Sequence, residues 1–578
     1  MRTRLERALA RVRGLVADPR WRRPAAVALA AYAAAAVVVL PLSLARALTA
    51  TEVHDTIGVS PSTFTLTTAG HSELRLGVAG TVYLPRSNGP LGLVATVDGP
   101  AETSGAPGSG GDLAAFVSPE MLGLYAGLFH DPETAVRGYV ELVERALVRQ
   151  ALIGEVVLTA VAGTGLLVAR QLLGVRFPIR HRRSRTVVAV ASALVLSSVL
   201  AAWQLRGAGD GPRSGTYSLP ALDGTQVEGA TTDSPVLRLL LGDAIPKVQT
   251  LVRRQESATD KFRSTATAGL LASRDQMSGP REGETAVLMQ SDMHCNEVMI
   301  AVQGEVRRLL TEQFGEDTPA FMAVTGDLTT NGTAAERSCI EQERKIAGDA
   351  PVAAVTGNHE SELSAEHMKA AGMTVLDGST EDVGDLSVLG DGDPERTELF
   401  GGTGQRGDES EADVGQRLRK TAEEDHPDLV LMHEAYAAAP FLGVTDMTTF
   451  LQGAGRSTVR EEDGIDDVPA SAVFYGHWHR RVPPRVLWNS DGTWTLVMEL
   501  DTSGGAIDTP TVGHFSTPWT APQQEASFPV VFMDRDTHLV TGYQIYSFDT
   551  DGSVTVEPRV EVGDPSTGTV TTPDQADR

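Results

Sequence analysis

Five segments in the C-terminal half of the chain place Asp, His or Asn side chains directly after short apolar runs. They are Asp292-Met293-His294, Gly326-Asp327, Gly357-Asn358-His359-Glu360, His433 and Gly476-His477-Trp478-His479. Imidazole, carboxylate and amide oxygen, without thiolate, form a donor set that suits Mn, Fe or Zn. One such segment alone has no diagnostic value, but five in succession predict a metal site.

The elements that position these side chains are predicted strands. The apolar runs comprise residues 285–291, 321–325, 351–356, 429–432 and 471–475. Ligands of α/β sheets bind beyond the carboxyl ends of the strands, where all five runs deliver their polar residues. The pattern therefore predicts an α/β fold with one shared site.

The order of these motifs closely resembles the calcineurin-like metallophosphoesterase superfamily over roughly residues 284–550. The stretch Gly326-Asp327-Leu328-Thr329-Thr330-Asn331-Gly332 further resembles its phosphodiesterase-like branch. The resemblance implies a four-layer α/β/β/α sandwich. It also implies a metal-dependent phosphoric ester hydrolase with two divalent metal ions, which are Mn, Fe or Zn.

The resemblance also assigns the ligands. One metal takes Asp292, His294 and His479. The second takes Asn358, His433 and His477, and Asp327 bridges the two. Two ions ~3.5–4 Å apart can share a hydroxide and stabilise an in-line displacement at phosphorus.

By the same resemblance, His359 faces the phosphoryl group and acts as an acid or charge stabiliser, so that His359 and Asp327 are the catalytic residues. Glu360 is expected to orient the imidazole of His359. Trp478 is expected either to wall the pocket or to pack in the core, and His514 to lie at the surface or at the pocket rim.

The only two cysteines exclude a disulfide scaffold or a Cys-rich zinc module. Cys295 follows His294, and Cys339 lies on the predicted helix Ala334–Ala347 after the second motif. Because these two elements are neighbours in a parallel strand order, a disulfide is expected. The alternative is that Cys295 lines the site and Cys339 is simply buried.

Hydropathy organises the first half of the chain. Two runs are uncharged or nearly so: residues 24–45, which are 22 residues long, and residues 186–205, which are 20 residues long. Each is long enough to cross a membrane as a helix. Residues 152–175 are a weaker candidate because Glu155 and Arg170 lie near the ends. We expect three transmembrane helices, and a buried helix is the alternative for the middle one.

Charge predicts the orientation. Residues 1–48 carry a net charge of +7, whereas the chain as a whole carries −26. Arg170–Arg185 holds six arginines and no acid. The positive-inside rule then places the N-terminus and the 176–185 loop in the cytoplasm, and the acidic remainder outside. An acidic C-terminal part makes a nucleic-acid partner unlikely on electrostatic grounds.

The expected organisation has nine parts. They are a basic cytoplasmic N-terminus (1–23), a span (24–45), a small extracytoplasmic module (46–150), a span (152–175), a basic cytoplasmic loop (176–185), a span (186–205), a linker with a helical lead-in (206–283), the metallophosphoesterase domain (284–550) and a flexible tail (551–578). Within the domain, residues 401–428 are expected to form a solvated loop and helix, or part of a substrate-selecting cap.

These features predict a multi-pass cell-membrane enzyme that hydrolyses an extracytoplasmic phosphodiester or phosphomonoester, for which an envelope component is one candidate. The lipid bilayer is its second expected partner. Two alternatives stay open. One is a non-catalytic membrane sensor or assembly protein, and the other is a cytoplasmic-facing nucleotide phosphodiesterase, which requires the middle span to be false.

Overall fold

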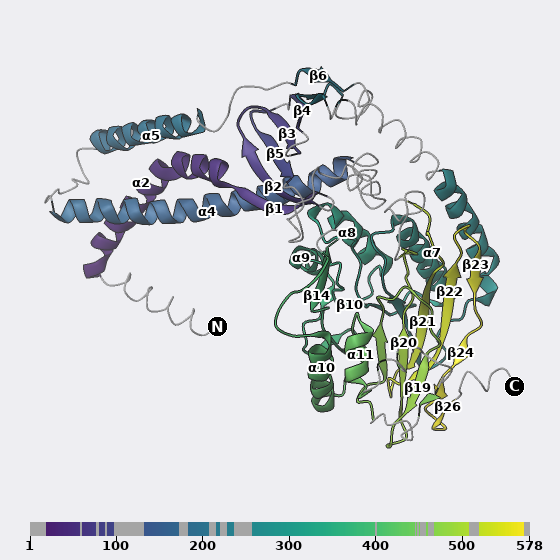
Figure 1. The fold of residues 1–578 in the computed structure, drawn as a ribbon. Helices are drawn as coiled ribbons and strands as arrows, with labels where there is room; N and C mark the ends of the chain where they lie inside the picture. Colours follow the sequence, from purple (N-terminus) through teal and green to yellow (C-terminus); the bar gives the residue numbers. More distant parts are fainter. Residues whose placement is uncertain are drawn as a thin grey trace. The chain divides into compact units, whose positions relative to one another are not determined.

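The computed structural model of the chain separates into two compact units (Figure 1). The first comprises residues 1–55, 61–99 and 139–242, and the second residues 56–60, 100–138 and 243–578. The structure describes residues 19–57, 60–76, 80–86, 89–97, 132–172, 183–206, 215–219, 228–235, 238, 257–398, 402–444, 447, 450, 458–459, 467–507 and 520–570.

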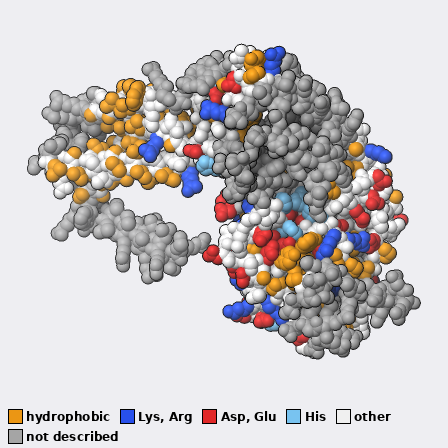
Figure 2. Space-filling view, viewed as in Figure 1, with side chains coloured by type: hydrophobic (Ala, Val, Ile, Leu, Met, Phe, Trp, Pro, Cys, Tyr) orange, Lys and Arg blue, Asp and Glu red, His pale blue; other side chains and the backbone are white. Residues whose placement is uncertain are grey.

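Three long helices occupy the first unit: α2 (Pro19–Ala50), α4 (Pro132–Leu172) and α5 (Arg183–Arg206). Two of them contain a segment long and apolar enough to cross a membrane, Pro24–Ala50 and Arg137–Leu172. Large apolar side chains such as Val156, Val161 and Trp203 are exposed on these helices. Figure 2 shows hydrophobic side chains along the surface of the helices. An exposed apolar surface of this extent marks an interaction site with lipid or protein.

The prediction of three spans is thus supported by length and composition for two helices only. For α5, whose first side chains lie outside the described residues, the described apolar part is Ala189–Leu205. The boundaries also differ from those predicted, because α2 continues to Ala50 and α4 is continuous from Pro132 to Leu172. The middle helix therefore begins well before residue 152.

Glu155, the acid that weakened the middle prediction, has polar partners on two helices. Its carboxylate accepts hydrogen bonds from Ser43 of α2 at 2.6 Å and from Thr159 of α4 at 3.1 Å. A second polar contact joins the same helices, between the hydroxyls of Tyr32 and Thr164 at 2.9 Å. Polar side chains on apolar helices usually pair with one another in this way.

A seven-stranded sheet completes the first unit, in the order β1-β2-β5-β3-β4-β7-β6. Its strands are β1 (Glu52–Ile57), β2 (Ser60–Thr67), β3 (His71–Arg75), β4 (Thr81–Arg86), β5 (Gly92–Val97), β6 (Tyr217–Ser218) and β7 (Thr231–Thr232). The expected linker is therefore not a linker throughout, because β7 pairs with β4 and β6 pairs with β7.

Two mixed sheets form the second unit. The first has the order β11-β10-β9-β8-β21-β22-β23, with β24 also on β22. Its strands are β8 (Glu284–Gln290), β9 (Phe321–Val324), β10 (Val352–Ala354), β11 (Thr374–Val375), β21 (Ala526–Asp534), β22 (Val540–Phe548), β23 (Val554–Val556) and β24 (Val560–Glu561).

The second sheet has the order β12-β13-β16-β18-β20-β19-β17. Its strands are β12 (Glu381–Val383), β13 (Leu386–Gly390), β16 (Leu429–Leu431), β17 (Thr458–Val459), β18 (Ala472–Tyr475), β19 (Arg485–Trp488) and β20 (Trp494–Glu499). Two short hairpins add β14 (Glu395–Glu398) with β15 (Gly402–Gln405), and β25 (Gly563–Asp564) with β26 (Thr569–Val570).

The helices of this unit are α7 (Glu297–Phe314), α8 (Arg337–Ile346), α9 (Glu362–Ala371), α10 (Glu411–Asp425) and α11 (Ala435–Phe441), with 3₁₀ turns η4 (Arg274–Gln276) and η5 (Ala334–Glu336). Residues 257–272 are also helical. Local chemistry sets the helix starts: the Asn296 side chain, for example, accepts hydrogen bonds from the backbone of Val298 and Met299 at the start of α7.

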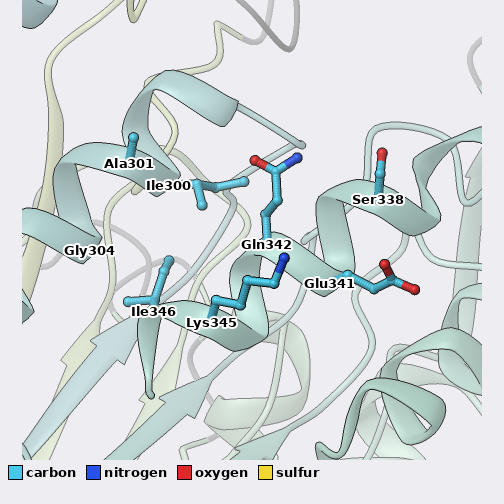
Figure 3. Close-up of a pocket in the computed structure, with 8 residues that line it drawn as sticks. All are labelled: Ile300, Ala301, Gly304, Ser338, Glu341, Gln342, Lys345 and Ile346. Atoms are coloured by element: carbon cyan, nitrogen blue, oxygen red, sulfur yellow. The ribbon is translucent and has the colours of Figure 1, made fainter. Parts of the chain in front are cut away.

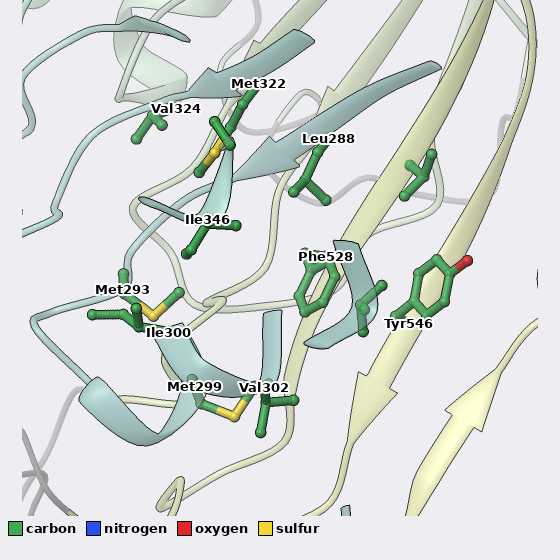
Figure 4. Packing of buried hydrophobic residues seen from close by; sticks show 14 of the residues in the cluster. Leu288, Met293, Met299, Ile300, Val302, Met322, Val324, Ile346, Phe528 and Tyr546 are labelled. Atoms are coloured by element: carbon green, nitrogen blue, oxygen red, sulfur yellow. The ribbon is translucent and has the colours of Figure 1, made fainter. Parts of the chain in front are cut away.

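Three hydrophobic clusters hold the sheets and helices together. One combines residues of both sheets, such as Val287 and Phe474. A second packs α7 and α8 on the first sheet and includes Met299, Ile346 and Phe528 (Figure 4). The third joins α10 and α11 to the second sheet. The predicted α/β class is therefore confirmed.

The predicted flexible tail is wrong for its first part. Strands β23 and β24 pair with β22 in antiparallel fashion, so the domain continues past residue 550 to at least Glu561. Backbone hydrogen bonds to an existing sheet edge give these residues a defined place. Residues 563–570 contain the hairpin β25–β26, and the last part of the expected tail, residues 571–578, lies outside the described residues.

Candidate metal centre

The two sheets deliver their polar residues to one place. Strands β8, β9 and β10 are parallel neighbours in the first sheet, and β16 and β18 are parallel neighbours in the second. The loops after these five strands carry the seven predicted ligands, Asp292, His294, Asp327, Asn358, His433, His477 and His479. Histidine side chains reach the surface of this unit close to acidic side chains (Figure 2).

Several residues of these loops have an unusual backbone conformation. Asp292, His294, Asp327, His477 and His479 all have positive φ, between 46° and 77°. Such strain at non-glycine residues clusters at functional sites.

Glycine makes the close approach of the loops possible. A Cβ at Gly476 would lie 1.9 Å from the hydroxyl of Ser291, and one at Gly357 would lie 2.2 Å from a carboxylate oxygen of Asp327. This is the physical reason for glycine immediately before His477 and Asn358.

One half of the site consists of Asp292, His294 and His479, whose donor atoms lie within 4.8 Å of one another. The Nε2 atoms of the two histidines are 3.0 Å apart, and that of His479 lies 3.3 Å from Asp292 Oδ1. Asp292 is fully buried, and its Oδ1 has no hydrogen-bond partner. A buried carboxylate oxygen without a donor is costly unless a cation binds it, so this half fits a metal ion.

Asp327 lies between the two halves. Its Oδ2 is 3.8 Å from Nε2 of His294 in the first half and 3.2 Å from Nε2 of His433 in the second. Its other oxygen, Oδ1, accepts a hydrogen bond from the backbone of His359 at 2.9 Å. One carboxylate oxygen is therefore held in place while the other faces both halves, as a bridging ligand requires.

The second half groups Asp327, His433 and His477. The amide oxygen of Asn358 faces the same point, 3.0 Å from His433 Nε2 and 3.1 Å from His477 Nδ1. The His477 side chain is 30% exposed, whereas that of His433 is fully buried. The site therefore opens to solvent beside His477.

The outer ring nitrogens of the ligands are occupied. His433 Nδ1 lies 2.8 Å from the Thr325 carbonyl, and His479 Nδ1 lies 3.0 Å from that of Ala506. Because a carbonyl only accepts, these Nδ1 atoms carry protons, so the Nε2 atom of each ring is the one that can bind a metal ion.

His477 is oriented by a residue that the sequence interpretation missed. Its Nε2 lies 3.2 Å from Glu434, a buried carboxylate that also accepts a hydrogen bond from the backbone of Tyr436. The only signal in the sequence was its position immediately after His433.

Electrostatics also favours ligand chemistry. Burial lowers the pKa of His294 to about 3, so that this imidazole is neutral, as a metal ligand must be. Burial alone would raise the pKa of Asp327, but the neighbouring His433 holds it well below its usual range. The Asp327 carboxylate is therefore ionised.

His359 lies beside the first half. The atom of His359 that could bind a metal lies within 4.8 Å of the corresponding ligand atoms of His294 and Asp327. Its Nδ1 lies 2.7 Å from the carbonyl oxygen of Thr330. The expectation that Glu360 orients this ring is wrong, because the Thr330 carbonyl does so. Glu360 instead accepts hydrogen bonds from the backbone of Asp327, Thr329 and Gly357, and so joins two ligand loops.

A disulfide joins Cys295 and Cys339, whose Cα atoms are 5.4 Å apart. It ties the loop after His294 to α8, and both cysteines are buried in the second hydrophobic cluster. Further, Cys295 N donates to the Leu328 carbonyl at 2.7 Å, in the loop after Asp327. The first two motif loops are thus held together by covalent and hydrogen bonds.

The remaining expectations have separate outcomes. Trp478 is partly buried and packs against the third cluster, with its ring edge-on to that of His477. Within residues 401–428, the helix α10 buries Val414 and Leu418, so it is a packed helix with one solvated face. His514 lies outside the described residues.

A groove of about 570 Å³ between α7 and α8 contains none of the predicted ligands (Figure 3). It is lined by Ile300, Ala301, Gly304, Ser338, Glu341, Gln342, Lys345 and Ile346. The metal centre is instead defined by converging donor atoms and not by the size of a cavity.

Comparison with protein families matches residues 286–481 to the calcineurin-like phosphoesterases. The matched range includes all seven predicted ligands and His359. A comparison with curated proteins gives no match.

Proposed function

We propose that the chain, whose residues 286–481 match the calcineurin-like phosphoesterases, is a membrane-anchored hydrolase of phosphodiesters or phosphomonoesters that uses two divalent metal ions. The observation that carries this proposal is the position of Asp327, whose single free carboxylate oxygen faces two groups of ligand atoms. Mn, Fe and Zn all suit the donors present. When bound, the two ions supply Lewis acidity that activates water and stabilises negative charge.

The protein's own residues hold and orient the reacting groups. Asp292, His294 and His479 would hold one ion, and Asn358, His433 and His477 the other. His359 would donate a proton to the leaving oxygen or stabilise charge on the phosphoryl group from its free Nε2, because its Nδ1 is committed to the Thr330 carbonyl.

For the domain we retain the four-layer α/β/β/α sandwich, with the cluster shared by both sheets as its centre and the other two clusters on its outer faces. For the N-terminal region we propose three crossings, with the third provided by α5. The arginine-rich 176–185 loop would be cytoplasmic and the phosphoesterase domain extracytoplasmic. The disulfide supports this placement, since disulfides persist in oxidising compartments.

The test uses the full-length chain in detergent, stripped of metal and reloaded separately with Mn²⁺, Fe²⁺ or Zn²⁺. Hydrolysis of a phosphodiester and of a phosphomonoester is measured, together with bound metal per chain. Asp327→Asn should lose at least one ion and nearly all turnover, because the bridging charge is gone.

The matched control is Asp317→Asn, which makes the same change at an exposed carboxylate. It should retain both ions and full turnover. An Asp327→Asn variant that binds two ions and has normal turnover would refute the bridging role of Asp327. A metal-loaded wild-type chain that cleaves no phosphoester would refute the proposed enzymatic activity.

A further inference from the structure

The hairpin β14–β15 lies against the loop that carries Asn358 and His359. The backbone N–H of Thr397, on β14, donates to the carbonyl of Asn358 at 2.9 Å. The side chains of the same two residues also meet, because Asn358 Nδ2 donates to Thr397 Oγ1 at 2.6 Å. The hairpin therefore contacts both the backbone and the side chain of a predicted ligand.

Two arginines hold the rest of this loop. Arg406 donates to the carbonyls of Gly357 and Glu360, at 2.7 and 2.8 Å. Arg396 donates to the Glu360 carbonyl and, at 2.9 Å, to that of Asn331 in the preceding motif loop. These contacts fix the backbone of the loop. The contact with Thr397 therefore determines the orientation of the Asn358 side chain.

An asparagine side chain can bind a cation only through its oxygen, because its NH₂ group is a donor. The two ends of the amide have nearly the same size, so shape alone does not decide which end faces His433 and His477. A hydroxyl that accepts a hydrogen bond decides it. Thr397 Oγ1 can accept from Nδ2 while its own proton is shared with the Thr403 hydroxyl, 3.1 Å away.

We infer that Thr397 is a positioning residue for the second metal half-site: its hydroxyl holds the Asn358 amide with Oδ1 toward His433 and His477. Partners of this kind, one step removed from the metal, typically contribute about 10- to 100-fold to metal affinity. This inference rests on the dinuclear centre proposed above, and it is tested by metal binding without reference to hydrolysis.

The experiment is equilibrium dialysis of the metal-stripped full-length chain against Mn²⁺. Wild type should bind two ions. Thr397→Val keeps the shape but removes the hydroxyl, so it should bind the first ion normally and the second about 10- to 100-fold more weakly. Thr397→Ser restores the hydroxyl and should rescue the second ion to within about threefold of wild type.

Thr421→Val is the matched control, because it makes the same change on α10, where the Thr421 hydroxyl donates to the Arg417 carbonyl and not to Asn358 or Thr397. It should bind both ions with near wild-type affinity. Equal weakening by Val and Ser at position 397, or wild-type binding by Thr397→Val, would overturn the inference while leaving the dinuclear centre intact. A wild-type chain that binds fewer than two ions would overturn both.

Discussion

The buried residue Glu343, on α8, leads to a prediction about how folding stability depends on pH. This prediction does not depend on catalysis. Its side chain is fully buried, and Gln290 donates to one of its oxygens at 2.5 Å. Burial raises its pKa to about 8 from the ordinary value of 4.5, although the Gln290 hydrogen bond opposes the shift. In the folded state this carboxyl is therefore neutral at pH values where it is ionised in the unfolded chain.

The sign of the pH dependence follows from proton binding. Between pH 4.5 and pH 8 the folded state binds the proton and the unfolded state does not, so stability falls as the pH rises. From pH 5 to pH 9 the loss amounts to roughly 4 kcal/mol as an upper bound. Glu343→Gln is neutral at every pH, and its amide oxygen can still accept the hydrogen bond from Gln290.

The assay is thermal unfolding of the full-length chain in detergent with excess chelator, followed by tryptophan fluorescence. The Tm of Glu343→Gln relative to wild type should rise between pH 5 and pH 9 by up to about 8 °C for a domain of this size. The control is Glu341→Gln, on the same helix but with a side chain 46% exposed, whose Tm difference from wild type should not change with pH. A Tm difference for Glu343→Gln that is equal at pH 5 and pH 9 would refute the reasoning.

Three further predictions concern the site and the membrane. His359→Ala should retain both metal ions by elemental analysis and lose about 10²- to 10⁴-fold in turnover; loss of metal would make it a ligand. Glu434→Gln should weaken binding of the second ion by about 10- to 100-fold in Mn²⁺ dialysis, because it orients His477, whereas unchanged affinity would contradict that role. A reporter fused after Arg578 should be active only outside the cytoplasm, and cytoplasmic activity would mean an even number of crossings.

Several features followed directly from the sequence because they depend on local patterns. Short apolar runs predicted β8, β9, β10, β16 and β18, and all five are strands. Their C-terminal ends predicted a single site, since ligands of α/β sheets bind beyond the carboxyl ends of the strands. The role of motif glycines such as Gly476 can also be predicted from the sequence, because close approach of two backbones needs a residue without a side chain.

Other features were mispredicted because they depend on pairing with distant residues. Residues 217–218 and 231–232 looked like linker, yet they complete a sheet whose other strands lie more than a hundred positions earlier. Residues 554–561 looked like a tail, yet β22 gives their backbone partners. Short segments with weak local preference take the conformation that an available sheet edge imposes.

The sequence by itself determined which side chains can bind metal and which strands present them, since residue type and hydrophobic pattern are local properties. Only the tertiary structure decided how those side chains are oriented. Glu360 binds the backbone of the motif loops, and the Thr330 carbonyl, not Glu360, orients His359. Thr397, on a separate hairpin, accepts a hydrogen bond from the Asn358 amide. Hydrogen bonds depend on distances of a few tenths of an ångström between residues remote along the chain, and only packing of the complete domain sets those distances.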